Sequence, residues 1–308
     1  METIEKEKLL VVGSSGFLGN SLVKFYDNSA TFGISALSRG EIVLTLKGKP
    51  VHRHKQLSFS NLARVIEKVN PQTIFNASGL VGDRECKLFP ETAKEANVNL
   101  PTMLAKITNE LGIQFIHFST DAVFGQNQEK RDEGVAPDPD TVYGITKLQG
   151  EVEATAISSN SLIIRTNFVG VDYLGQRGLF SYFSNSFDRK VPVTGYNNVV
   201  FNPISIRFLC KNVDKLRKKG VAGIFHLAGK TKLTKFEFGR LILNSMHEQP
   251  FNSRNFISSQ SADNDVRLDM TLETPKMDHF DLQHGDLGSE VQRMCIERKR
   301  RLVENLES

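Results

Sequence analysis

Thr120, Tyr143 and Lys147 are the residues of this 308-residue chain whose types and spacing most clearly suggest chemistry. Thr120 follows an apolar run at 113–118 that predicts a buried strand, and Tyr143 opens a helical pattern in which Lys147 stands four residues later. Positions i and i+4 share one helix face, so we expect Lys147 beside Tyr143. An ammonium there would lower the pKa of the phenol from its ordinary value of about 10. Such a tyrosine is a usable acid or base near neutral pH, and Thr120 could offer its hydroxyl to the same carbonyl oxygen.

A glycine-rich turn near the N-terminus predicts that the chain binds a dinucleotide. The apolar run 9–12 is typical of a central parallel strand, and it leads directly into Gly-Ser-Ser-Gly-Phe-Leu-Gly at 13–19 and an amphipathic helix. Gly13 would permit the tight turn, Gly16 would let the backbone approach a pyrophosphate, and Gly19 would let the helix pack close to the strand. The spacing is GxxGxxG and not the GxGxxG of the dehydrogenase fingerprint.

The second predicted strand indicates which dinucleotide is preferred. It spans 32–37 and ends at Ser38 and Arg39, whereas NAD-preferring proteins usually carry an acidic residue near this point. A serine and an arginine suit a 2′-phosphate, so we predict NADPH, with NADH as the alternative. The small-residue turn Ala77-Ser78-Gly79, at the end of a later strand, is expected to lie against the nicotinamide ribose.

The order of the predicted elements indicates an α/β fold with a doubly wound parallel sheet of the Rossmann type. Strands and helices alternate as far as a strand at 161–166, and the helix predicted at 91–111 contains Pro101, which should kink or divide it. The regularity then breaks, and an apolar run at 223–227 predicts one more buried strand. We therefore expect a dinucleotide-binding domain at 1–168 and 199–229, and a smaller, discontinuous C-terminal substrate lobe at 169–198 and 230–308.

The composition is that of an ordinary soluble globular protein, with 39% hydrophobic and 24% charged residues. The net charge of +4 is small and spread out, so binding to nucleic acid is not indicated. No apolar segment approaches the roughly 20 residues that cross a bilayer, and the three cysteines are far apart. We expect a cytoplasmic protein with no membrane segment, disulfide or metal site. The basic run 298–301 is either a solvated helix face or a patch for an anion or partner.

Taken in order, these motifs resemble those of the extended short-chain dehydrogenases/reductases, and in particular the dTDP-4-dehydrorhamnose reductase group. The resemblance rests on the glycine motif 13–19, on Phe-Ser-Thr-Asp-Ala-Val-Phe at 118–124, on Tyr-Gly-Ile-Thr-Lys-Leu-Gln-Gly-Glu at 143–151 and on Ile-Arg-Thr-Asn-Phe at 164–168. It extends over nearly the whole chain. The sequence departs from the pattern of the group at the turn Asn76-Ala77-Ser78-Gly79 and at Gln56, Lys87 and Leu268, all of which lie outside these motifs.

The resemblance implies a catalytic triad of Thr120, Tyr143 and Lys147 and a nucleotide-sugar site between two lobes. It implies that a 4-keto-6-deoxy nucleotide sugar is reduced by NADPH while Tyr143 protonates the keto oxygen, and a homodimer is the family-level expectation. The cofactor contacts that it implies are Gly13, Ser15, Gly16, Phe17, Leu18, Gly19, Ser38, Arg39, Ala77, Ser78, Gly79, Asn97, Thr120, Tyr143, Lys147, Thr166 and Phe168. The corresponding substrate contacts are Asp121, Val123, Asn167 and Asn202.

Several alternatives stay open at the level of sequence. A 4,6-dehydratase is disfavoured because resembling dehydratases carry Asp and then Glu after the threonine, whereas Asp121 is followed here by Ala122. An epimerase, a bifunctional epimerase/reductase, and a non-catalytic regulatory subunit resembling the methionine adenosyltransferase β subunit all remain compatible with the motifs. Asp121 could equally cap a turn. The aromatic residues at 180–187 could stack on a nucleotide base or form the core of the substrate lobe.

Overall fold

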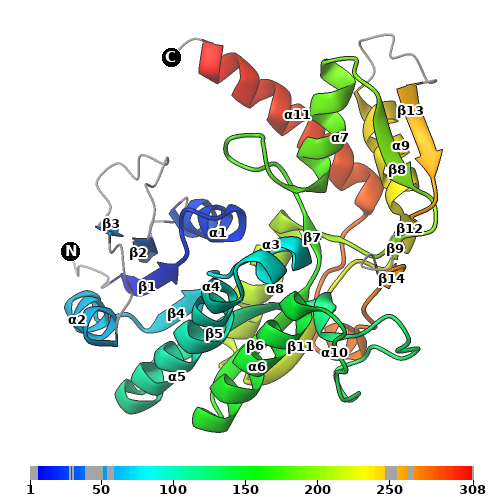
Figure 1. The fold of residues 1–308 in the computed structure, drawn as a ribbon. Helices are drawn as coiled ribbons and strands as arrows, with labels where there is room; N and C mark the ends of the chain where they lie inside the picture. The colour runs from blue at the N-terminus through cyan, green and yellow to red at the C-terminus, as the bar shows by residue number, and fades with distance from the viewer. Residues whose placement is uncertain are drawn as a thin grey trace.

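The computed structural model describes residues 6–27, 29, 31–38, 51–53, 59–246, 255–261 and 267–306. In this part of the chain a parallel sheet forms the centre of the molecule, with seven strands in the order β11-β6-β5-β4-β1-β2-β3 (Figure 1). The strands are β1 (Glu7–Val12), β2 (Phe32–Ser38), β3 (Val51–Arg53), β4 (Thr73–Asn76), β5 (Gln114–Thr120), β6 (Ser161–Thr166) and β11 (Gly223–Leu227). The predicted doubly wound α/β fold is confirmed, and β6 and β11 have the predicted bounds.

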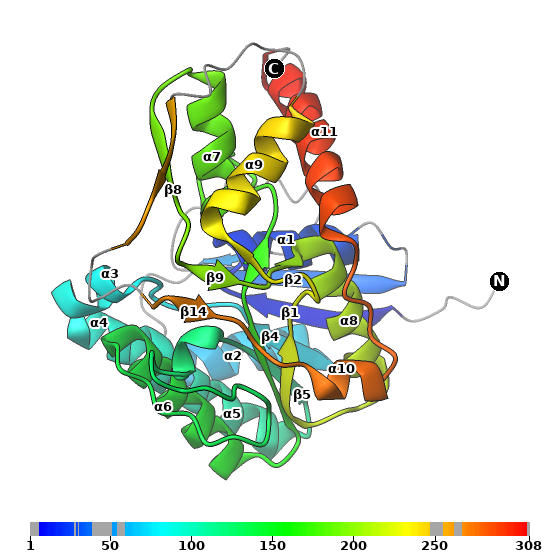
Figure 2. The same cartoon turned by 90° about the vertical axis from the view of Figure 1, so that its right-hand side faces the viewer.

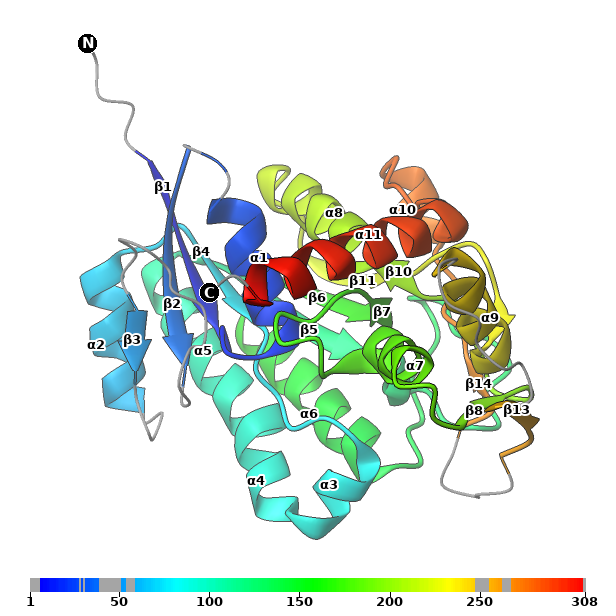
Figure 3. The ribbon, with the colours of Figure 1, turned by 90° about the horizontal axis from the view of Figure 1, so that it is seen from above.

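Helices cover both faces of the sheet because successive strand residues point to opposite faces. In β1, Leu9 and Val11 enter one core and Leu10 and Val12 enter the other. Figure 3 shows the three layers from above, with α1 and α8 on one side of the sheet and α2, α5 and α6 on the other. These helices are α1 (Phe17–Asp27), α2 (Phe59–Val69), α5 (Leu100–Leu111), α6 (Val142–Ile157) and α8 (Ile206–Lys218).

Pro101 divides the helix that the sequence predicts at 91–111. The structure has α4 (Pro90–Lys94), then a π-helical turn η1 (Glu95–Asn99), then α5. Pro101 lies in the first turn of α5, directly after the π-helical turn, and the backbone stays helical on both sides of this change. The π-helical turn lies against α6, since a Cβ on Gly150 would come 2.0 Å from the carbonyl oxygen of Asn97.

The second lobe packs helices on three short sheets, with strand orders β10-β7, β12-β9-β14 and β13-β8 in the described segments. Figure 2 shows its helices α7, α9 and α11 on one side of the central sheet. Phe180, Phe183 and Phe187 are buried in its core, so these aromatic residues form the core of the lobe. No described helix is both long and apolar enough to cross a membrane. The lobe elements are β7 (Phe168–Val169), α7 (Gly178–Asp188), β8 (Val193–Tyr196), β9 (Val200–Phe201), β10 (Ile204–Ser205), β12 (Leu233–Thr234), α9 (Lys235–Ser245), β13 (Phe256–Ser259), β14 (Asp269–Met270) and α11 (Leu287–Leu306).

The chain crosses between the lobes more often than the predicted domain limits suggest. Phe201 in β9 is buried in the core of the substrate lobe, and β9 pairs with β12 and β14 of that lobe. Conversely, Met277 in α10 (Pro275–His279) and Leu282 are buried in the core beneath the central sheet. Apolar periodicity marks these residues as buried but does not say which core buries them.

Candidate active site

The strand order reverses between β1 and β4, and in parallel sheets of this kind ligands bind outside the carboxyl ends of the strands at such a point. Gly13 lies there with a φ of +84°, and a Cβ on it would come 2.6 Å from the backbone nitrogen of Ser78. A Cβ on Gly19 would come 2.3 Å from the carbonyl oxygen of Gly13. Glycine is therefore required at both positions, and the backbone of the turn 13–16, which we call the glycine cradle, leads directly into the start of α1. This cradle fits the pyrophosphate of a dinucleotide.

The residues around the glycine cradle include one that sequence reasoning missed. Ser38 donates a hydrogen bond to the hydroxyl of Ser15 at 2.7 Å, whereas Arg39 lies outside the described residues. Arg177 donates to the carbonyl oxygen of Ser15 at 3.4 Å, so a guanidinium from the substrate lobe reaches the cradle. Phe17 packs edge-on against Phe168, with 5.3 Å between the ring centroids. No local motif marks Arg177, because it reaches the turn only through the folding of the lobe.

Thr120 and Tyr143 are brought together by close packing of a turn and a helix. Thr120 ends β5, and its hydroxyl accepts a hydrogen bond from the backbone N–H of Ala122 at 3.1 Å, which caps the short helix η2 (Asp121–Val123). At the start of α6, Thr141 accepts a hydrogen bond from the N–H of Gly144 at 3.0 Å. A Cβ on Gly144 would come only 2.0 Å from the carbonyl oxygen of Ala122. The missing side chain thus lets the first turn of α6 lie directly on the turn after Thr120.

The electrostatics of Tyr143 and Lys147 differ from the sequence prediction. Burial raises the pKa of Tyr143 to about 12, while a hydrogen bond with Thr120 opposes this rise. Lys147 donates to the carbonyl oxygen of Phe118 at 2.7 Å and lies 3.3 Å from Nε2 of His117. Burial lowers the pKa of Lys147 to about 8. The expected lowering of the tyrosine pKa is therefore wrong for this structure, because burial disfavours both charged forms. Tyr143 consequently keeps its proton at neutral pH.

Asp121 is held by an ion pair. Its carboxylate lies 2.8 Å from Nη2 of Arg267, and Arg267 also donates to the backbone oxygen of Asp121 at 3.0 Å. Burial and the charge of Arg267 lower the pKa of Lys235, whereas the Asp121 carboxylate raises it. The Lys235 ammonium therefore lies near this ion pair. Lys235 and Arg267 lie more than 100 residues from Asp121 along the chain. Neither was identified as a site residue from the sequence, since no spacing links them to the motifs.

Two predicted cofactor contacts hold backbone segments in place. Asn97 accepts a hydrogen bond from the N–H of Leu80 at 2.9 Å and donates to the oxygen of Leu80 at 3.0 Å and to Thr146 at 3.1 Å. It therefore ties the turn after β4 to α6. Thr166 donates to the carbonyl oxygen of Leu227 at 2.7 Å, across β6 and β11. Both side chains shape the crevice, and a direct contact with the cofactor stays a prediction.

Two predicted substrate contacts, Asn202 and Asn167, differ in how far the protein itself uses their side-chain amides. Asn202 donates to the oxygens of Gly229 and Leu272 at 2.9 and 2.8 Å and accepts from the N–H of Leu272 at 2.9 Å, so a substrate would have to displace one of these bonds. Asn167 donates to Met270 at 2.7 Å, but its buried Oδ1 has no hydrogen-bond partner in the described structure. Asn167 thus has an acceptor free for a ligand.

Two other predicted contacts, Leu18 and Val123, have side chains that belong to hydrophobic cores. Leu18 packs beneath α1 in the core of the central sheet, and Val123 is fully buried. Any contact of these two residues with a ligand would therefore be made by their backbone atoms. Their side chains affect the site only through the packing of the cores.

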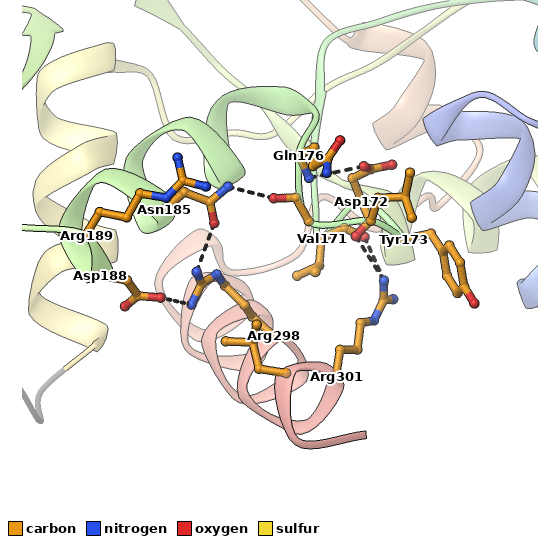
Figure 4. Close-up of a pocket in the computed structure, with 12 residues that line it drawn as sticks. Val171, Asp172, Tyr173, Gln176, Asn185, Asp188, Arg189, Arg298 and Arg301 are labelled. Atoms are coloured by element: carbon orange, nitrogen blue, oxygen red, sulfur yellow. Dashed lines mark hydrogen bonds and ion pairs between the residues drawn. The ribbon is translucent and has the colours of Figure 1, made fainter. Parts of the chain in front are cut away.

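A separate cavity of about 320 Å³ lies between the segment 171–176, α7 and the C-terminal half of α11 (Figure 4). Arg298 forms an ion pair with Asp188 and donates to Asn185 at 2.9 Å. Arg301 donates to the carbonyl oxygen of Asp172 at 3.1 Å. These two arginines of the basic run are therefore occupied in fixing α11 to the lobe, and the catalytic candidates do not line this cavity.

The crevice at the reversal of the strand order, the glycine cradle and the meeting of Thr120 with Tyr143 define an extended short-chain dehydrogenase/reductase. The predicted resemblance to that class is confirmed. Within it, the chain belongs to the family described as RmlD substrate binding domain, whose model matches residues 7–271.

The chain is similar in sequence to several curated proteins, and the length of the aligned region differs among them. The chain is 25% identical over 240 residues to the probable low-salt glycan biosynthesis reductase Agl14 of Haloferax volcanii, covering 75% of this chain and 78% of that protein. It is 29% identical over 194 residues to the dTDP-4-dehydrorhamnose reductase of Escherichia coli, covering 60% of this chain and 64% of the reductase, less than two thirds of its length. It is 24% identical over 287 residues to methionine adenosyltransferase 2 subunit beta of Bos taurus, covering 88% and 83%.

Solved structures share the fold. The dTDP-4-dehydrorhamnose reductase from Bacillus anthracis, in complex with NADP, superposes with a TM-score of 0.80 at 17% identity, covering 96% of this chain and 100% of that chain. The Bordetella bronchiseptica enzyme WbmG, in complex with NAD, superposes with a TM-score of 0.82 at 15% identity, covering 96% and 95%. Both neighbours hold a nicotinamide dinucleotide, in line with the predicted class of cofactor.

Proposed function

We propose that this protein is an NAD(P)H-dependent reductase of a 4-keto-6-deoxy nucleotide sugar, with NADPH preferred and NADH as the alternative. The observation that carries the proposal is the placement of Tyr143 against Thr120, at the carboxyl edge of the sheet that also carries the Gly13 cradle. A tyrosine that keeps its proton at neutral pH is suited to donate it to an oxygen that gains negative charge.

Each residue has a defined task in this reduction. The Gly13 cradle and the turn after β4 would hold the dinucleotide, whose nicotinamide would supply a hydride to the keto carbon. Tyr143 donates its proton to the keto oxygen, and the hydroxyl of Thr120 holds that oxygen in position. Lys147 is buried beneath the site and anchored on the carbonyl of Phe118. Lys235, close to the Asp121–Arg267 pair, would meet a negatively charged part of the substrate.

The experiment that tests this proposal is oxidation of NADPH and NADH by the purified protein against a panel of 4-keto-6-deoxy nucleotide sugars. We expect Tyr143→Phe to lower turnover by about 10² to 10⁴, the usual contribution of a positioned general acid. Tyr196→Phe, which removes a hydroxyl from an exposed tyrosine of the substrate lobe, is the matched control and should keep full turnover. Full turnover in Tyr143→Phe would refute the assignment of the proton donor.

A second candidate function is a regulatory subunit that binds the cofactor and a partner enzyme. It is favoured by the likeness to methionine adenosyltransferase 2 subunit beta, which extends over 88% of this chain and further than the match to the Escherichia coli reductase. Tight NADPH binding with no turnover on any sugar, together with a stoichiometric partner, would select this alternative. An epimerase would instead convert a sugar without net consumption of NADPH, so the same panel separates it from the reductase.

A further inference from the structure

The loop 171–177, which lies between β7 and α7, reaches the glycine cradle from the substrate lobe. Nη1 of Arg177 donates to the carbonyl oxygen of Ser15 at 3.4 Å. A Cβ on Gly178, the residue that follows the loop, would come 3.0 Å from the ring of Phe17, the first residue of α1. The end of the loop therefore lies against the turn that leads into α1, and it carries a guanidinium to that turn.

On its other side the loop borders the cavity of about 320 Å³ between α7 and α11. Arg301 of α11 donates to the carbonyl oxygens of Asp172 and Val171 at 3.1 and 3.5 Å (Figure 4). Asn185 of α7 donates to the carbonyl oxygen of Gly175 at 2.7 Å. A cavity supplies fewer van der Waals contacts than a packed core, so these hydrogen bonds have a large share in fixing the path of the loop.

Asp172 connects the end of the loop that Arg301 holds to the end that carries Arg177. Its buried carboxylate accepts hydrogen bonds from the backbone N–H groups of Gln176 and Arg177, both at 3.3 Å. Its carbonyl oxygen accepts from the N–H of Gly175 at 2.9 Å, which closes a turn within the loop. A shift of Asp172 would therefore be passed on to the backbone of Arg177.

We propose that Arg301 is a positioning residue for the dinucleotide, because it holds the loop 171–177 so that Arg177 faces the glycine cradle and binds the pyrophosphate there. A guanidinium carries five N–H donors that match the geometry of phosphate oxygens, and the contact with Ser15 uses one of them. The proposal rests on the dinucleotide binding that the reductase and the regulatory subunit have in common, and not on the reduction itself.

A double-mutant cycle separates positioning from the other ways in which Arg301 can affect binding. A positive charge on α11 attracts an anionic ligand whether or not Arg177 is present, so its effect on the free energy of binding would add to that of Arg177. A residue that acts only by placing Arg177 has no further effect once Arg177 is removed. The two cases differ in the coupling between the two substitutions.

The experiment measures the Kd of NADPH at low salt by calorimetry for the full chain and for Arg301→Met, Arg177→Ala and the double variant. We expect each single substitution to weaken binding about 2- to 5-fold, the effect of an exposed charge contact. The double variant should bind no more weakly than the weaker single variant. Losses that multiply to about 4- to 25-fold would overturn the proposal, and so would wild-type affinity in Arg301→Met.

Arg293→Met is the matched control, because it removes a charge from the exposed face of the same helix and should keep the wild-type Kd. An equal loss in Arg293→Met and Arg301→Met would show an effect of net charge and refute the positioning role. If Arg301→Met fails to fold, Asn185→Ala takes its place in the cycle with the same expected coupling to Arg177, since it removes the hydrogen bond to Gly175.

Amide hydrogen exchange with no cofactor added supplies a second measurement. In Arg301→Met the N–H groups of residues 175–177 should exchange about 3-fold faster or more, because the turn that protects them loses its support. Unchanged exchange would refute the claim that Arg301 holds the loop. A protein that shows the expected coupling and exchange but reduces no sugar would refute the proposed reductase and leave this inference standing.

Discussion

Gly144→Ala should separate Tyr143 from Thr120 while preserving every chemical group in the site. The added Cβ would lie 2.0 Å from the carbonyl oxygen of Ala122, about 1.4 Å short of the 3.4 Å at which ordinary contact begins. Neither partner can rotate away, because both atoms are fixed by the backbone. The first turn of α6 must therefore shift by roughly 1 Å, carrying Tyr143 and Lys147 with it. A misplacement of about 1 Å at a reacting group can cost about 10²-fold in rate, or about 2.7 kcal/mol of barrier.

The assay for Gly144→Ala is kcat/KM on the accepted nucleotide sugar, with urea unfolding measured beside it. We expect about a 10²-fold loss of kcat/KM and a loss of about 1–3 kcal/mol in the free energy of unfolding, as is usual for overpacking. Gly288→Ala is the matched control, since Gly288 also lies in the first turn of a helix but its Cβ would find only ordinary contact at 3.6 Å. Wild-type turnover and stability in Gly144→Ala would refute the argument that this glycine sets the distance between Tyr143 and Thr120.

Three further predictions concern charges in and near the site. Glu151→Gln leaves the buried Arg165 without its countercharge and should lower the free energy of unfolding in urea by about 3–5 kcal/mol. The control Glu153→Gln, on the exposed face of the same helix, should change it little. Equal losses in the two variants would contradict the role of the Glu151–Arg165 pair. Burial lowers the pKa of His226 to about 3, so below pH 6.5 the unfolded chain binds a proton that the folded chain does not bind. Lowering the pH from 7.5 to 5.5 should therefore reduce the free energy of unfolding by about 1.4 kcal/mol. His226→Gln should lack this part of the pH dependence. Arg177→Ala should weaken NADPH binding about 2- to 5-fold at low salt, because a single exposed charge contact contributes little. The Kd is measured by calorimetry, and an unchanged value would show that Arg177 does not contact the cofactor.

The parts of the fold that follow from the sequence are those governed by local pattern. The strands at 161–166 and 223–227 have the predicted bounds because short apolar runs between turn residues have few other ways to be buried. The glycine motif gives the cradle because a φ of +84° at Gly13 is accessible to glycine at little cost. The helix around Pro101 changes from a π-helical to an α-helical turn because the proline ring and missing N–H do not fit a regular α-helix.

Other features depend on contacts between distant parts of the chain. Lys147 is four residues from Tyr143, as the sequence predicts, but its ammonium position is set by Phe118 and His117 on β5. The limits of the two lobes differ from the prediction at Phe201 for the same reason, since a buried phenylalanine can enter either of two adjacent cores.

The sequence by itself determined the class of the protein, the parallel sheet and the identity of Thr120, Tyr143 and Lys147 as candidates, because spacing along a helix and order along a strand are local properties. Only the tertiary structure decided that Tyr143 keeps its proton at neutral pH and that Arg177, Lys235 and Arg267 reach the site. Burial and the direction of a hydrogen bond depend on what packs against a residue, and its partners here lie up to 162 positions away in the chain.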